Sequence, residues 1–173
     1  MKLNLKRFVC TIAAMAMLCI FCASASAQSQ GLMKALNVKG QAKSISYDDW
    51  LFSFNKSGKS SDASNNNGIT TLGCYAPHSE FEIEVKNNRM VKIGEYSQGG
   101  GWYIEFTAYD SNNRPIKGNL YSGDELSKRG AKISYSGADA KGNWTKMIID
   151  KSGARGGEPS WIPSSIKRTI KYW

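Results

Sequence analysis

Four polar turns, each placed after a short stretch of alternating apolar residues, constrain the fold of this 173-residue chain more than any other feature. In each turn a glycine or an asparagine stands where a tight hairpin needs a positive φ angle, and a polar or basic residue follows it. These residues are Gly58, Asn88, Asn113 and Gly142, which recur at intervals of 25 to 30 residues. A period in this range is typical of stacked hairpins that bury their apolar faces only against one another.

The segments between the turns have the two-residue period of β-strands. The clearest case is Phe81, Ile83 and Val85, which alternate with three glutamates before the turn at residues 87–88. A row of carboxylates suits metal or acid–base chemistry, but a solvated strand face opposite a buried one is the favoured interpretation. The aromatic residues of segment 41–54 also fall two apart, which predicts one strand face that ends at the first turn.

The remaining segments are short and polar or rich in glycine. Gln28 to Lys39 predicts one helical turn, and Ser122 to Arg129 predicts another. Ser60 to Gly68 has almost no apolar residue, so we expect an exposed loop near residues 55–68. The sequence therefore predicts an all-β fold with at most short helical turns. Its antiparallel meander of repeated hairpins either stays a single meander or closes into a sandwich.

Residues 1–27 have the pattern of a secretory signal peptide. Lys2, Lys6 and Arg7 precede an apolar stretch from residue 8 to residue 22, and residues 25–27 (Ala-Ser-Ala) form a small-residue cleavage site. The apolar stretch is short for a membrane span, so cleavage near Ala27 is favoured over a retained anchor. We therefore expect a secreted or periplasmic protein without stable membrane insertion, whose residues 28–173 form a single all-β domain.

Cleavage leaves Cys74 as the one cysteine of the mature chain, because the other three lie in the signal peptide. A buried apolar role is favoured for Cys74 over a reactive thiol or a disulfide-linked dimer. The single histidine, His78, is four residues away, which on a strand is about 13 Å and too far for a catalytic pair. Two such residues are also too few for a zinc site. We expect no enzymatic activity, no metal and no other cofactor.

The mature chain is moderately basic. Removal of three basic residues with the signal peptide leaves 20 lysines and arginines against 14 acidic residues, a net charge of +6. Basic and aromatic residues alternate near the C-terminus, a pattern that can bind single-stranded nucleic acid. Outside the cell such a charge is better suited to anionic envelope polymers or lipid headgroups, so nucleic acid is not the expected partner.

Two of the turns and the last strand carry a resemblance to a known family. The segments are Tyr109-Asp110-x-Asn-Asn113-Arg114, the run from Asp139 to Lys146, and Ile166-Lys-Arg168-Thr-Ile170-Lys-Tyr172. They resemble the tyrosine–aspartate (YD) repeats of Rhs-type proteins, and more closely short secreted proteins built from a few degenerate repeats of this kind. The resemblance implies an exported antiparallel sheet of hairpins without catalytic residues. The first two turns lack the Tyr-Asp pair, and the repeats are too few to enclose a toxin as the long members do.

These observations favour a non-enzymatic exported protein that acts as a binding or structural module of the cell envelope or the extracellular space. A glycan-binding β-sandwich is the alternative, because exposed tryptophans stack on sugar rings, and a small secreted hydrolase is less favoured. The expected partners are an envelope polymer, a glycan or a protein. The candidate ligand-binding residues are Trp161, Lys167, Arg168, Lys171 and Trp173.

Overall fold

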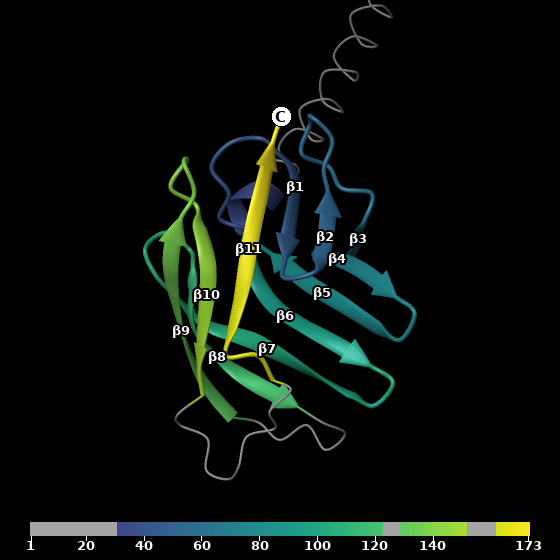
Figure 1. Ribbon diagram of the computed structural model, residues 1–173, viewed down its shortest axis with the longest axis vertical. Coiled ribbons are helices and arrows are strands. Elements are labelled where there is room, and N and C mark those ends of the chain that lie inside the picture. Colours follow the sequence, from purple (N-terminus) through teal and green to yellow (C-terminus); the bar gives the residue numbers. More distant parts are fainter. Residues whose placement is uncertain (1–30, 123–128, 152–161) are drawn as a thin grey trace, which may run out of the picture.

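In the computed structural model, residues 31–122, 129–151 and 162–173 are described, and they form one curled antiparallel sheet of eleven strands (Figure 1). The expected signal peptide lies outside the described residues, as does nearly all of the helical turn expected at 122–129. The strands are β1 (Ala42–Tyr47), β2 (Trp50–Ser53), β3 (Ala63–Asn66), β4 (Ile69–Ala76), β5 (Ser79–Lys86), β6 (Arg89–Ser97), β7 (Gly100–Tyr109), β8 (Pro115–Ser122), β9 (Arg129–Ala138), β10 (Trp144–Asp150) and β11 (Ser165–Tyr172).

The strand order is that of a meander. From β3 to β11 each strand pairs with its neighbours in sequence, and β1 pairs with β11, so that the β1–β2 hairpin completes the sheet. Residues 31–35 form the expected helical turn before β1. The predicted all-β antiparallel meander of hairpins is confirmed. The meander forms a single curled sheet and does not close into a sandwich of two sheets.

Alternation along the strands places apolar side chains on the concave face of the sheet and polar side chains on the convex face. Phe81, Ile83 and Val85 of β5 are each at most 5% exposed. On the opposite face of β5, Glu82 and Glu84 form ion pairs with Lys92 of β6. One buried and one hydrated face is the usual arrangement of an antiparallel sheet, and it accounts for the glutamates that the sequence places in a row.

An aromatic cluster holds the two ends of the strand order together across the core. Phe81 of β5 stacks on Tyr47 of β1 and on Trp50 of β2, with ring centroids 6.1 and 5.8 Å apart. Phe52 of β2 lies 6.3 Å from the same ring. Since β2 begins the strand order and β5 lies near its other end, these aromatic contacts close the curl.

Two segments differ from the expectation. The aromatic run 41–54 is a hairpin and not one strand, because Asp48 adopts a φ of 49° and turns the chain between β1 and β2. Aspartate tolerates this left-handed conformation, but the apolar pattern on both sides hides the turn.

The expected exposed loop contains β3, which pairs with β4. Backbone hydrogen bonds form this strand at the edge of the sheet, so it needs no apolar alternation in its sequence.

The four residues expected to have positive φ angles all do so: 77° at Gly58, 57° at Asn88, 59° at Asn113 and 74° at Gly142. The Asn88 turn has only two residues, since Asn87 is also left-handed with a φ of 52°. The other three turns are longer. Their positive-φ residues donate a backbone hydrogen bond to the carbonyl of the residue that opens the turn.

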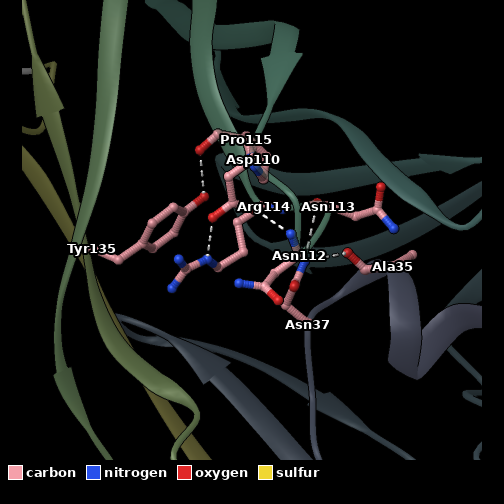
Figure 2. A network of polar contacts seen from close by, with 8 residues as sticks. All are labelled: Ala35, Asn37, Asp110, Asn112, Asn113, Arg114, Pro115 and Tyr135. Atoms are coloured by element: carbon pink, nitrogen blue, oxygen red, sulfur yellow. Dashed lines mark hydrogen bonds and ion pairs between the residues drawn. The ribbon is translucent and has the colours of Figure 1, made fainter.

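The three longer turns share one side-chain cap. The opening residue is Asn55, Asp110 or Asp139, and its Oδ1 accepts hydrogen bonds from the backbone N–H groups two and four residues later. Figure 2 shows the cap at Asp110, whose carboxylate also forms an ion pair with Arg114 at 2.7 Å. Asparagine and aspartate favour such turns because their side chains replace a backbone acceptor.

A repeated contact joins successive hairpins. The Tyr109 hydroxyl donates to the carbonyl of Met90 at 3.0 Å. The Tyr135 hydroxyl donates to the carbonyl of Pro115 at 2.9 Å, a contact that Figure 2 shows. Each acceptor lies two residues after the positive-φ residue of the preceding turn. The turns therefore set the places at which each hairpin is fastened to the next.

The Gly142 turn provides a test of this local analysis. We expect Gly142→Ala to lower the free energy of unfolding by about 1 kcal/mol or more, because a φ of 74° is unfavourable for a residue with a Cβ atom. Gly130→Ala in β9 is the matched control, since an added Cβ there meets no atom within 4 Å and needs no left-handed conformation. Urea denaturation of the two variants measures the difference, and equal destabilisation would contradict the assignment.

Candidate functional site

The structure separates the four candidate ligand-binding residues that it describes. Trp173 is 50% exposed at the end of β11, and Lys167 and Lys171 are exposed on the convex face of that strand. Arg168 points to the opposite face and is only 2% exposed. Trp161 lies outside the described residues. Three of the five therefore remain surface candidates, and Arg168 is removed from the set.

Arg168 is a structural cation of the core. Its Nε donates to the carbonyl of Trp144 at 3.0 Å, and its Nη1 donates to the carbonyl of Leu36 at 2.7 Å, just after the helical turn. Its guanidinium lies 3.4 Å from the centroid of the Trp144 ring. No ion pair of the described residues includes Arg168. Carbonyl oxygens and an aromatic face thus replace a carboxylate in compensating its charge.

The sequence carried a signal for this burial. Ile166, Arg168 and Ile170 are spaced two apart, so they share one face of β11, and Ile166 is fully buried. The two-residue period therefore assigned Arg168 to the core face. Its charge obscured that assignment, because arginine is seldom buried unless its donors find acceptors.

The segment that follows the helical turn is held against the tips of two hairpins. Asn143 and Lys39 exchange two hydrogen bonds, from Lys39 N to Asn143 Oδ1 at 2.7 Å and from Asn143 Nδ2 to the Lys39 carbonyl at 3.2 Å. Asn37 Nδ2 donates to the carbonyl of Asn113 at 3.3 Å (Figure 2). The helical turn and its extension therefore cover one end of the curl and gather the hairpin tips around it.

Two lysines converge on the exposed indole at this end. The Nζ of Lys43 lies 5.2 Å from the centroid of Trp173, and the Nζ of Lys56 lies 5.7 Å from it. Lys171, near the end of β11, precedes Trp173 by two residues. We call Lys43, Lys56, Lys171 and Trp173 the tryptophan–lysine surface. None of its lysines takes part in an ion pair within the described part of the chain.

The adjoining turn is also polar and basic. The Nζ of Lys141 lies 3.9 Å from the centroid of Tyr172, whose hydroxyl donates to the Asp139 carboxylate. Burial opposes ionisation of Asp139, but hydrogen bonds from Tyr172, Asn143 and the Lys141 backbone outweigh it and hold the pKa of Asp139 well below its ordinary value. This carboxylate is therefore engaged in its own turn.

A second aromatic group lies on the convex face. Tyr103 stacks on Tyr121, with ring centroids 4.6 Å apart, and Tyr96 lies 6.1 Å from Tyr103. The Nζ of Lys92 lies over both Tyr96 and Tyr103, at 5.6 and 5.4 Å from their centroids. The ring faces are thus occupied by one another and by a lysine that is ion-paired with two glutamates. Lysines also lie near the Trp173 ring, but it stacks on no other ring of the described residues and is 50% exposed, so it is the more accessible ring for a ligand.

Comparison of the chain with protein-family models, with curated proteins and with solved structures found no match. Within the described ranges, no helix is long and apolar enough to cross a membrane.

The role of Arg168 can be tested by Arg168→Lys. We expect a loss of about 2–4 kcal/mol in the free energy of unfolding, because lysine retains the charge but cannot reach the Trp144 and Leu36 carbonyls together. Lys167→Ala, at an exposed neighbouring position, should change it by no more than about 0.5 kcal/mol. Urea denaturation measures both, and a fully stable Arg168→Lys variant would refute the structural role.

Asp139 predicts a dependence of stability on pH. Its pKa is lower in the folded chain than the value of about 3.9 of an unfolded aspartate, so its stabilisation is present above pH 4 and is lost as the pH falls further. Asp139→Asn should be less stable at pH 7 while still capping its turn, as Asn55 does. We expect the difference in urea midpoint between Asp139→Asn and the unmodified protein to become smaller as the pH is lowered from 5 to 2. A constant difference would show that the carboxylate charge contributes nothing.

Proposed function

We propose that this protein is an exported, non-enzymatic binding module whose tryptophan–lysine surface binds an anionic polymer of the cell envelope. The observation that carries this proposal is the convergence of the Lys43 and Lys56 ammonium groups on the exposed Trp173 ring. Two like charges brought to one ring repel each other. An anionic group bound beside this ring lowers the repulsion, so the surface favours a negatively charged ligand.

The two residue types give such a surface two kinds of contact. The indole of Trp173 can stack on the apolar face of a sugar ring, and the lysines can pair with carboxylate or phosphate groups along the polymer. The backbone holds the tryptophan in place, because its N–H donates to the Gln41 carbonyl at 3.3 Å. An acidic polysaccharide combines both contacts, and we propose it as the ligand class.

A neutral glycan is the second candidate, and the exposure of Trp173 supports it. A hydrolase is the less favoured candidate, as the surroundings of His78 and Cys74 indicate. His78 is exposed in the turn between β4 and β5, while Cys74 is half-buried with its Sγ 3.7 Å from the Leu51 carbonyl. This contact accounts for Cys74 without a catalytic partner.

The resemblance to YD repeats remains a proposal about the origin of the hairpins. The contacts of Tyr109 and Asp110 support it, because they give the adjacent pair two structural tasks. The tyrosine fastens its hairpin to the preceding one at the Met90 carbonyl, and the aspartate caps the turn that follows. A repeat whose tyrosine and aspartate have these structural roles needs no catalytic residue.

We expect the purified protein to bind immobilised polygalacturonate, and Trp173→Ala to weaken the binding about tenfold at low and high salt alike, through loss of stacking. Lys43→Ala/Lys56→Ala should weaken it by a similar factor at low salt and by much less at high salt, where the charge contribution is already screened. Surface plasmon resonance at two salt concentrations measures these effects.

Lys117→Ala/Lys132→Ala is the matched control, since it removes two exposed lysines that are paired across β8 and β9, away from Trp173. This double variant lowers the net charge by the same amount as Lys43→Ala/Lys56→Ala, and it should bind polygalacturonate nearly as well as the unmodified protein does. Equal loss in both double variants would mean that the total charge, and not this surface, drives binding. Equal affinity for polygalacturonate and neutral dextran would favour the neutral-glycan candidate.

A further inference from the structure

A separate groove lies between the helical turn and two hairpin tips. It has a volume of about 420 Å³, and its wall includes Lys34 of the helical turn, Lys86 and Arg89 at the β5–β6 turn, and Tyr109 and Asn113 at the β7–β8 turn. This volume falls in the range of small-molecule sites. None of the four residues of the tryptophan–lysine surface lines the groove.

The charges around the groove are all positive. Lys34, Lys86 and Arg89 contribute to its wall, and no aspartate or glutamate does. The ion pairs of the described residues include none of these three cations. A concave site lined by cations alone raises the local concentration of anions.

Arg89 is fixed in a position suited to an anion. Its Nε donates to Asn113 Oδ1 at 3.0 Å, and its guanidinium lies 5.2 Å from the centroid of Tyr109. Tyr109 is itself anchored by its hydrogen bond to the Met90 carbonyl. Within the described ranges, the two Nη groups of Arg89 have no hydrogen-bond partner. A guanidinium held at Nε with free Nη groups presents donors that match a carboxylate or a phosphate.

Side-chain amides complete the wall. Asn87 and Asn88 both stand at left-handed positions of the β5–β6 turn, with φ angles of 52° and 57°, and both line the groove. Each amide offers donors and an acceptor, a combination suited to the hydroxyl groups of a sugar. The tight turn fixes the backbone that carries them, so little ordering is needed on binding.

We infer that this groove is a second binding site, which takes a small hydroxylated anion: a sugar that carries a carboxylate or a phosphate group. Arg89 binds the anionic group, Lys34 and Lys86 attract it, and the asparagine amides bind the hydroxyls. The inference does not rest on the proposed function, because it concerns other residues and a ligand of one sugar unit.

Isothermal titration calorimetry of the full-length protein with galacturonate, glucose 6-phosphate and glucose tests the inference. We expect at least one of the two acids to bind and glucose to bind at least tenfold more weakly, and the tighter acid identifies the anionic group. Arg89→Lys should weaken binding of that acid about tenfold, because lysine keeps the charge but loses the planar donor pair. Lys34→Ala/Lys86→Ala should weaken it by a similar factor without a change in thermal stability, since neither lysine side chain has a hydrogen-bond or ion-pair partner among the described residues.

Two further variants give the result that would overturn the inference. Lys117→Ala/Lys132→Ala removes the same charge from two exposed positions that do not line the groove, and Trp173→Ala removes the indole of the tryptophan–lysine surface. Both variants should bind the acid with the affinity of the unmodified protein. This expectation holds even if the protein does not bind polygalacturonate through Trp173. Three results would each refute the groove as the site. The first is that neither acid binds. The second is that Arg89→Lys and Lys34→Ala/Lys86→Ala bind the acid with unchanged affinity, and the third is that Trp173→Ala loses as much affinity for the acid as these variants do.

Discussion

The buried guanidinium of Arg168 holds the helical turn against the sheet. It joins β11 to β10 through the Trp144 carbonyl and to the helical turn through the Leu36 carbonyl, 132 residues away in sequence. A buried cation without a carboxylate partner is costly unless its donors are satisfied. The position of the helical turn is therefore coupled to the burial of Arg168, and the hairpin tips assemble around the segment that follows this turn.

The same contact pattern recurs along the sheet. Tyr109 and Tyr135 donate to the carbonyls of Met90 and Pro115, and Arg168 donates to that of Trp144. Each acceptor follows a positive-φ turn residue by two positions. The first two contacts use a neutral hydroxyl on the sheet itself, whereas the third uses a longer charged side chain that also reaches the helical turn. One repeated local design thus serves both the packing of hairpins and the closure of the curl.

Both proposed sites depend on this scaffold. Arg89 is held by Asn113 beside Tyr109, whose own hydroxyl fastens β7 to the preceding hairpin. Trp173 follows the strand that Arg168 anchors. The cations fall into two groups with different surroundings. Arg168 has its donors satisfied by carbonyls inside the protein, whereas Lys43 and Lys56 stand at an exposed indole without an ion-pair partner in the described part of the chain. Exposed cations without an ion-pair partner, such as Lys43 and Lys56 and those that line the Arg89 groove, are suited to an external ligand, whereas Arg168 is not.

Most of the strands, the four polar turns and the left-handed residue in each of these turns could be predicted from the sequence, because alternation and turn chemistry act over a few neighbouring positions. Asp48 and β3 were missed, since an apolar pattern conceals the first and the second is held only by backbone hydrogen bonds. The tertiary structure decided the pairing of β1 with β11, the burial of Arg168 and the groove at Arg89. Each of these brings together residues far apart in the chain, and no local pattern specifies which distant carbonyl, ring or amide a side chain will meet.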